Sequence, residues 1–354
     1  MKMAKRAAFE IAGQTIEPGN RATVALDIGR LYTHTHLELV AEVIHGRKDG
    51  PVLLVCAAIH GDELNGVEIC RQLMKRQALE RLRGTLIIVP VVNIFGFLHH
   101  SRYMPDRRDL NRCFPGSERG SMGARFANCF VKEVLHKSSH VIDLHTGAVH
   151  RSNLPQVRAN LDDPVVRQMA ESFGAPVMLN AALRDGSLRG CADDAGIPLI
   201  LYEAGEALRF NDYAIKTGLA GVINVMRDLQ MLPPVRRKNK ILCEEARTSG
   251  WVRAELDGTC RFIAQLGQRV KVGDQLATIA SPFSPQEQSV LAPWAGIIIG
   301  RNNIPLVNEG DALFHVARFE TLGGAERSVE AFRETLGDTE YAFDQTEALP
   351  ENSG

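Results

Sequence analysis

The sequence predicts an α/β protein: a mainly parallel, doubly wound sheet, followed by a smaller all-β, barrel-sandwich-like domain. Strand-like apolar runs alternate with helical patterns up to about residue 232. The Pro-rich basic segment PPVRRKNK then interrupts the chain, and short β-like runs with many glycines follow it. We therefore expect an α/β domain over residues 1–235, a β-rich domain over 241–320 and an acidic tail over 321–354.

The elements of the first domain follow from hydrophobic periodicity. Residues 22–46 alternate between apolar and polar side chains, which predicts two antiparallel strands joined by a polar turn. The run PVLLVCAAIH, residues 51–60, is continuously apolar, as is typical of a strand covered on both faces. Further strands are expected in 85–93, 140–145, 176–180 and 197–203, and helices in 62–79, 121–137, after Asp163-Pro164, in 187–196 and in 211–232.

Two segments of the β-rich domain, residues 252–280 and 290–317, resemble each other. Each contains a glycine after its first strand (Gly258, Gly296) and closes on a Gly-Asp pair (Gly273-Asp274, Gly310-Asp311). This repetition predicts a small barrel of two pseudo-symmetric halves, similar to the barrel-sandwich domains of biotinyl and lipoyl carriers. The turn SPFSPQEQS has no lysine that could carry a cofactor, so we expect a structural or gating module.

Composition excludes several classes of function. Hydrophobic residues make up 45% of the chain, and no apolar run reaches the roughly 18 residues of a membrane span. The first residues lack the features of a signal peptide, so we expect a cytoplasmic protein that does not act at membranes. With 41 basic and 42 acidic side chains the chain has no overall field that would hold nucleic acid. The seven cysteines contain no C-x-x-C pair and are expected to be reduced.

A histidine ends the buried strand 51–60 and begins the motif His60-Gly61-Asp62-Glu63. Taken alone, His60 and Glu63 also fit a strand cap and a carboxylate that complements a helix dipole. A second buried strand, HVIDLH, ends on His145 and makes a pair of metal ligands the better interpretation. Two imidazoles and one carboxylate are the three protein ligands of many catalytic zinc sites, whose fourth position holds water.

Arginines are concentrated in the segment SRYMPDRRDLNRCFPG, residues 101–116, which follows another buried strand. The planar guanidinium group suits recognition of carboxylates, and Asn111 beside Arg112 is expected to grip the two oxygens of an α-carboxylate. The alternative is a solvated basic loop, which fits DRRD better than the more apolar LNRCFPG.

The motifs HGDE, RDLNR, DLHTG and YEAGE, in this order, resemble the succinylglutamate desuccinylase/aspartoacylase family, relatives of the zinc carboxypeptidases. The resemblance covers residues 50 to about 230 and implies a single zinc ion per chain. By this resemblance His60, Glu63 and His145 hold zinc, Glu203 is the general base and acid, Arg102 polarises the scissile carbonyl, Asn111 and Arg112 bind the substrate carboxylate, and Asp109 orients His60.

The sequence departs from the shorter acylases of this family in two places. Six residues separate Arg102 from Asp109, and the duplicated β module is similar to that of longer bacterial members. Those members include deacetylases that act on acetylated diaminobutyrate in ectoine breakdown.

The resulting hypothesis is a zinc-dependent amidohydrolase that uses metal-activated water to remove an acetyl or succinyl group from an N-acylated amino acid. Its partner would be this small molecule, and a homo-oligomer is possible. A zinc carboxypeptidase acting on short peptides is the alternative within the same chemistry. A scaffold protein with an inactive metal site is a more distant alternative, because His60, Glu63, His145 and Glu203 are all present. A cysteine hydrolase using Cys113 is more distant still, because no base that would pair with Cys113 is visible in the sequence.

Overall fold

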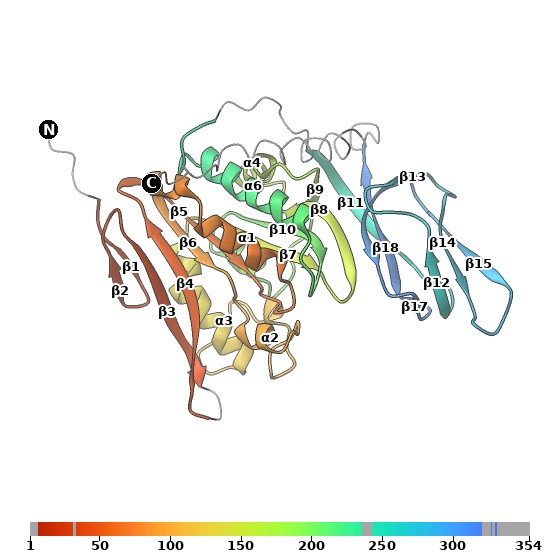
Figure 1. Ribbon diagram of the computed structural model, residues 1–354, viewed down its shortest axis with the longest axis horizontal. Helices are drawn as coiled ribbons and strands as arrows, with labels where there is room; N and C mark the ends of the chain where they lie inside the picture. The colour runs from red at the N-terminus through yellow and green to blue at the C-terminus, as the bar shows by residue number, and fades with distance from the viewer. Residues whose placement is uncertain (1–5, 31–32, 236–242, 321–326, 328–329, 331–354) are drawn as a thin grey trace, which may run out of the picture.

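A computed structural model describes residues 6–30, 33–235, 243–320, 327 and 330 of the protein (Figure 1). The strands are β1 Phe9–Ile11, β2 Gln14–Ile16, β3 Arg21–Arg30, β4 His36–His45, β5 Lys48–Ala57, β6 Arg83–Val89, β7 His140–Gly147, β8 Arg151–Ala159, β9 Val177–Asn180, β10 Leu199–Glu206, β11 Glu244–Arg253, β12 Gly258–Phe262, β13 Arg269–Val270, β14 Gln275–Ala280, β15 Glu287–Leu291, β16 Gly296–Asn302, β17 Leu306–Val307 and β18 Ala312–Phe319. The helices are α1 Asn65–Met74, α2 Ile94–Leu98, α3 Met122–Glu133, α4 Pro164–Phe173, α5 Leu188–Asp194 and α6 Asp212–Asp228, with 3-10 turns η1 Gln77–Arg81, η2 Leu110–Arg112 and η3 Leu135–Lys137.

The sheet of the first half has the strand order β3-β4-β6-β5-β7-β10-β8-β9. The pairs β5–β6, β5–β7, β7–β10 and β8–β9 are parallel. The pairs β3–β4, β4–β6 and β8–β10 are antiparallel. The sheet is therefore mixed: β6, β5, β7 and β10 at its centre are parallel, as are β8 and β9 at one end, whereas the other neighbouring strands are antiparallel.

Helices cover both faces of this sheet, and strand β5 shows why its sequence is continuously apolar. Leu53 and Val55 pack in one core with residues of α1, α4 and α6. Leu54 and Cys56 point the other way, into a second core with residues of α3 and α5. Because successive side chains of a strand point to opposite faces, a strand between two cores has no polar face.

The β-rich half shares hydrogen bonds with the sheet of the first half. Strands β8, β9, β11, β18 and β16 pair in turn, and β16 pairs back onto β8, which closes a ring. Leu154 of β8, Leu179 of β9 and Ile299 of β16 belong to one small core with residues of β11 and β18. The ring contains strands from both sides of residue 241, the predicted start of the β-rich domain. The β module is therefore joined to the first half by strand pairing, and the domain boundaries stay a prediction.

A second sheet, β15-β14-β12-β17, packs against this ring, and the two Gly-Asp turns of the predicted duplication adopt the same conformation. Gly273 and Gly310 have φ values of +86° and +87°. Asp274 Oδ2 accepts a hydrogen bond of 2.7 Å from the backbone N–H of Lys271, and Asp311 Oδ2 accepts one of 2.8 Å from that of Asn308. This equivalence supports the internal duplication.

The predicted acidic tail, residues 321–354, lies outside the described residues except for two positions. Among the described helices, none has both the length and the apolar character that crossing a membrane requires.

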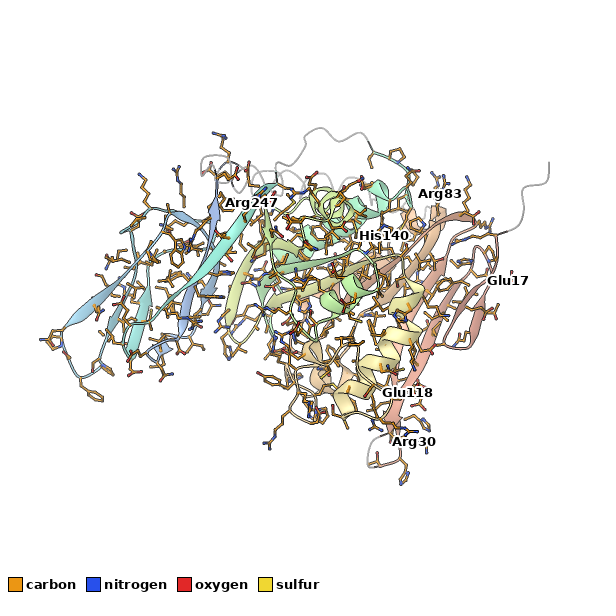
Figure 2. All side chains as sticks on the ribbon, turned by 180° about the vertical axis from the view of Figure 1, so that it is seen from behind. Glu17, Arg30, Arg83, Glu118, His140 and Arg247 are labelled. Carbon is orange, nitrogen blue, oxygen red and sulfur yellow. The ribbon has the colours of Figure 1, made fainter. Side chains whose placement is uncertain are left out.

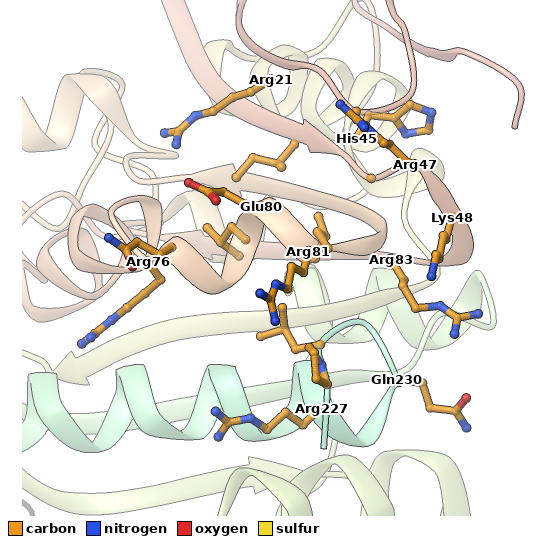
Figure 3. A pocket seen from close by; sticks show the side chains of 18 of the residues that line it. Arg21, His45, Arg47, Lys48, Arg76, Glu80, Arg81, Arg83, Arg227 and Gln230 are labelled. Atoms are coloured by element: carbon orange, nitrogen blue, oxygen red, sulfur yellow. The ribbon is translucent and has the colours of Figure 1, made fainter. Parts of the chain in front are cut away.

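A large groove, here called the amino-edge groove, lies at the starts of β5 and β6, next to the ends of α1 and α6 (Figure 3). Its volume is about 1140 Å³. In Figure 2 Arg83, which lines the groove, and His140 mark the edge of the molecule where β6 and β7 begin. Glu118 lies toward the opposite edge in the same view. The groove is lined by the basic residues Arg21, Arg47, Lys48, Lys75, Arg76, Arg81, Arg83 and Arg227 and by one acidic residue, Glu80.

Candidate active site

The turn after β5 brings His60 and Glu63 together at the carboxyl end of the strand. The backbone N–H of Glu63 donates to the carbonyl of His60 over 3.1 Å, which closes the turn just before α1. A Cβ atom on Gly61 would lie 1.9 Å from the backbone carbon of Gly96. Glycine is required between the histidine and the carboxylate because the turn packs directly on α2.

His145 and Glu203 lie near the carboxyl ends of the neighbouring parallel strands β7 and β10, in register with each other. Both strands continue a little beyond these residues, to Gly147 and Glu206. Neighbouring strands are about 4.8 Å apart, and residues in register point to the same face. Glu203 therefore lies beside His145 because of the strand pairing alone.

The atoms that His60, Glu63 and His145 can offer as ligands all lie within 4.8 Å of one another. His60 Nδ1 is 2.7 Å from Glu63 Oε1, and His145 Nδ1 is 2.8 Å from Glu63 Oε2. All three residues are buried, with 2–4% of their surface exposed. The structure thus brings together the three residues predicted as metal ligands.

Each imidazole is held on its other nitrogen by an aspartate. His60 Nε2 is 3.1 Å from Asp109 Oδ1, and His145 Nε2 is 2.8 Å from Asp143 Oδ2. Carboxylates in this position orient histidine ligands and strengthen their basicity. Asp109 has the predicted position, whereas Asp143 was not predicted. Its signal was present, because Asp143 and His145 alternate on one face of β7.

Opposite charges decide the protonation of this buried group. Burial by itself would raise the pKa of Glu63, but His60 and His145 hold it well below its ordinary value. Burial would likewise lower the pKa of His145, yet Asp143 and Glu63 raise it well above its usual range. These shifts favour the charged form of the buried Glu63 carboxylate between the two imidazoles.

Arg102, which six residues separate from Asp109 in the sequence, lies next to His60, Glu63 and His145. Its Nη2 donates to Asp109 Oδ2 over 2.9 Å, and its Nη1 donates to Glu63 Oε1 over 3.3 Å. Burial would lower the pKa of Arg102, and these two carboxylates raise it. The longer loop between Arg102 and Asp109 thus folds back so that the two side chains meet.

Asn111 and Arg112 line the same cleft, but Asn111 also has a structural role. Its Oδ1 accepts a hydrogen bond of 2.8 Å from the backbone N–H of Leu188, the first residue of α5. Its backbone N–H donates to Asp109 Oδ1 over 2.8 Å. Asn111 therefore ties the arginine-rich loop to the start of α5 and to the aspartate that holds His60.

Glu203 faces the cleft between an amide and a guanidinium group. Asn153 Nδ2 donates to its Oε2, and Arg158 Nε lies 3.4 Å from its Oε1. These neighbours come from β8, the antiparallel partner of β10. A carboxylate fixed on one side by donors and open to the cleft on the other can exchange a proton with a bound molecule.

The cleft itself has a volume of about 450 Å³, and we call it the arginine-lined cleft. Besides the predicted residues it is lined by Arg151, Arg158, Arg184, Arg189 and, from β11, by Trp251 and Arg253. Arg151 lies 5.1 Å from the centre of the Trp251 ring. Sequence reasoning missed this set because its members come from separate elements, two of them in the β module.

The donor set fits a zinc ion. Two imidazole nitrogens and one carboxylate oxygen are ligands that zinc prefers, and the aspartates that hold both Nε2 atoms leave the Nδ1 atoms free to bind it. His60, Glu63 and His145 all line the cleft, so a small molecule there would reach the same centre.

Comparisons with known proteins place the chain among relatives of known family. The sequence model of the succinylglutamate desuccinylase/aspartoacylase catalytic domain matches residues 49–229. An N-alpha-acetyl-L-2,4-diaminobutyric acid deacetylase of Halomonas elongata is 27% identical over 297 residues, which are 78% of this chain and 85% of the relative.

Solved structures show the same fold. The product-bound ectoine utilization protein of Ruegeria pomeroyi has a TM-score of 0.76 and 23% identity, with 88% of this chain and 96% of the other covered. A succinylglutamate desuccinylase/aspartoacylase of Rhodobacter sphaeroides also has a TM-score of 0.76 and 23% identity, with 89% and 97% covered.

Proposed function

Because the chain belongs to the succinylglutamate desuccinylase/aspartoacylase family, we propose that it is a zinc-dependent amidohydrolase that removes a small acyl group from an N-acylated amino acid. The acyl group would be acetyl or succinyl, and the products a carboxylic acid and a free amino acid. The Halomonas relative, named for deacetylation of an N-acetyl amino acid, supports this reaction class.

The observation that carries the proposal is the convergence of His60 Nδ1, His145 Nδ1 and the Glu63 carboxylate, with an aspartate behind each imidazole. Zinc held by these residues would lower the pKa of bound water toward about 7 and polarise the amide carbonyl. An N-acyl amino acid and a peptide both present an amide bond to this centre. The centre therefore does not distinguish these two substrate classes, and an activity assay is needed to do so.

The other side chains of the cleft would act on the substrate directly. Glu203 accepts a proton from the attacking water and delivers it to the departing amine nitrogen. Arg102 donates to the carbonyl oxygen as negative charge develops on it. Arg112, with Asn111 fixing its loop, binds the α-carboxylate of the amino acid.

An assay of acyl amino acids against peptides tests this function. The zinc-loaded protein is given N-acetyl and N-succinyl amino acids in parallel with unblocked dipeptides, and the release of free amine is followed. We expect turnover of at least one acyl amino acid at a kcat/KM at least about 10-fold above that of any dipeptide, a difference of about 1.4 kcal/mol in the transition state. Turnover of dipeptides alone would establish the carboxypeptidase alternative.

A further inference from the structure

The amino-edge groove holds positive charge that the proposed chemistry does not use. Eight basic side chains line it, against one acidic side chain, that of Glu80. The groove lies where β5 and β6 begin, whereas His60, His145 and Glu203 lie at or near the carboxyl ends of parallel strands. A surface with this excess of one charge attracts a ligand of the opposite charge, so the groove suits an anion.

Four of the basic side chains lack a partner within the part of the chain that the structure describes (Figure 3). Arg47, Lys48, Arg81 and Arg83 are exposed and make no side-chain hydrogen bond or ion pair with another described residue. Arg21 of the same groove shows the contrast, because it forms an ion pair with a glutamate of β4. The four unpaired side chains are therefore available to the carboxylates of a ligand.

Apolar side chains line the groove as well. Pro233 and Pro234 are exposed, and Met74 is half-buried. The volume of the groove, about 1140 Å³, exceeds the range of about 300–1,000 Å³ that is typical of small-molecule pockets. Size, charge and apolar surface together fit a stretch of acidic polypeptide better than a small inorganic anion.

The acidic tail, residues 321–354, has the complementary composition. It contains eight acidic and two basic side chains, whereas the rest of the chain contains 34 acidic and 39 basic ones. Apolar side chains lie among its carboxylates, including Phe332, Leu336, Tyr341 and Phe343. The nearly neutral chain thus consists of a positive body and a negative end, whose opposite charges attract each other.

The acidic tail is long enough to reach the groove. It follows β18, whose Phe319 pairs with Ala246 of β11. The strand order β18-β11-β9-β8-β10-β7-β5 places β18 about 30 Å from β5 along the sheet. The 34 residues after Glu320 would cover about 50 Å even as one continuous helix. Chain length therefore permits binding within one molecule.

A continuous surface leads from the end of β18 to the groove, over α4 and the end of α6 (Figure 1). Glu245 of β11, beside the end of β18, is 2.7 Å from Arg167 Nη1 of α4. Gln168 Nε2, the next residue of α4, donates to Asp228 Oδ2 over 3.0 Å. Asp228 ends α6, and Arg227 before it lines the groove. A segment that leaves β18 thus reaches the groove without crossing the arginine-lined cleft.

From these observations we propose that the acidic tail binds in the amino-edge groove of its own chain. Its carboxylates face the four basic side chains that lack described partners, and its apolar side chains contact the prolines. The bound tail ties the end of the β-rich half to the first half, about 30 Å from the cleft. This proposal is independent of the proposed function.

Crosslinking of the full-length chain with a carbodiimide, which joins a lysine amine directly to a carboxylate, tests the proposal. The acidic tail has no lysine, so each crosslink from its carboxylates reports a lysine elsewhere. Lys48 and Lys75 line the groove, and the exposed Lys271 is the matched control. Because only β16 separates the neighbouring β13 from β18, a tail without a binding site would react with Lys271 more often than with the groove.

We expect tail crosslinks at Lys48 and Lys75 to exceed those at Lys271 at least about 10-fold, because binding raises the effective concentration of the carboxylates there. Mass spectrometry of the peptides measures this ratio. The crosslinks should decrease at least about 3-fold between about 10 mM and about 1 M NaCl, because the Debye length shortens from about 30 Å to about 3 Å.

Variants assign the effect to the groove. The double variant Arg81→Gln/Arg83→Gln should lower the crosslinks at Lys48 and Lys75 by about 2- to 10-fold, as expected for two exposed charge interactions. Arg261→Gln, which removes an exposed arginine of β12, is the control and should leave them unchanged. Circular dichroism checks that each variant is folded, and the salt series tests the proposal without any substitution.

Three outcomes would overturn the proposal. Crosslinks at Lys48 and Lys75 that are no more frequent than those at Lys271, or that persist unchanged in 1 M salt, would show that the groove does not bind the tail by charge. In a mixture of ¹⁵N-labelled and unlabelled protein, we expect both peptides of each crosslink to carry the same label. Peptide pairs with mixed labels would instead place the tail of a second copy in the groove.

Discussion

The arginine-lined cleft and the amino-edge groove are both basic, yet only the cleft has the geometry of a reactive site. The groove is the larger hollow, about 1140 Å³ against about 450 Å³. Arg47, Lys48 and Arg81 of the groove are exposed, and Figure 3 shows its basic side chains spread apart over several elements. In the cleft, His60, Glu63 and His145 converge within 4.8 Å and are buried.

This difference follows from the direction of the strands. Strands β5, β7 and β10 run parallel, so their carboxyl ends deliver His60, His145 and Glu203 to one place. The groove lies at the opposite ends of the strands, about 30 Å away along the ten residues of β5. Volume and positive charge therefore do not identify a reactive site, whereas converging buried donors with fixed partners do.

The largest effect is expected from Glu203→Gln, which keeps the shape of the side chain but removes the proton acceptor. We expect kcat to fall by about 10²–10⁴-fold while zinc content stays near wild type. The control is Glu206→Gln on the same strand, whose carboxylate accepts from Asn303 Nδ2 over 2.9 Å. Steady-state kinetics at saturating substrate measures both. An undiminished kcat in Glu203→Gln would remove Glu203 from the mechanism.

Asp143→Asn tests whether the aspartates behind the histidines matter for metal binding. Removal of such a partner typically costs about 10- to 100-fold in metal affinity, which a chelator competition measures. The exposed pair Asp27–His36, 2.9 Å apart, offers a matched control, and Asp27→Asn should leave zinc affinity unchanged. Equal affinities in the two variants would mean that Asp143 only supports the fold.

The charge of the cleft should also appear in the pH dependence of stability through His315. Burial lowers the pKa of His315 to about 3, and Arg158 and Arg184 add to this. The folded state thus keeps His315 neutral, while the unfolded state binds a proton below its ordinary pKa of about 6.5. The stabilisation is complete above pH 6.5 and is lost as pH falls.

Between pH 7.5 and 5.0 this histidine alone should lower the free energy of unfolding by about 2 kcal/mol. The variant His315→Gln should lose this contribution, and denaturant melts at the two pH values measure the difference. A second histidine, His45 in the amino-edge groove, is compared with His315: its Nδ1 lies 2.8 Å from Thr85 Oγ1, and burial lowers its pKa as well. Its contribution remains in the His315→Gln variant, so the difference between variant and wild type reports on His315. An identical pH dependence in His315→Gln and wild type would contradict the assignment.

The smallest effect is expected from the groove. Arg81→Gln and Arg83→Gln remove exposed charges far from the cleft and should change kcat/KM by less than about 2-fold, as typical surface substitutions do. The same assay with an acyl amino acid checks this. A decrease comparable to that of the cleft variants would show that the two hollows are coupled.

The sequence predicted the residues of the metal site because His60 and His145 each close an apolar run in the sequence and Glu63 follows in the turn after His60. The strand-to-histidine transitions at His60 and His145 are local patterns, and the pairing of β5, β7 and β10 then places them side by side. Asp143 was predictable in principle from the alternation along β7. The Gly-Asp repeats of the β module were likewise visible, because a turn with a positive φ needs glycine.

Other features depend on interactions between distant parts of the chain. Strand β8 escaped prediction because Arg151–Ala159 contains Pro155 and several polar side chains that face the cleft. The ring that joins β8, β9, β11, β18 and β16 was not predictable, because it links residues about 150 positions apart through strand pairing. Arg184 and Trp251 enter the cleft from separate elements, so no local pattern marks them.

A zinc titration of chelator-stripped protein, followed by release of amine from an N-acyl amino acid, tests the assignment of the metal centre most directly. We expect activity to be absent without metal and to rise linearly to a plateau at about one zinc per chain. The His145→Ala protein, measured in parallel, should stay inactive and bind less than about a tenth as much zinc. Full activity in the stripped protein, or full zinc binding by His145→Ala, would contradict the assignment of this centre.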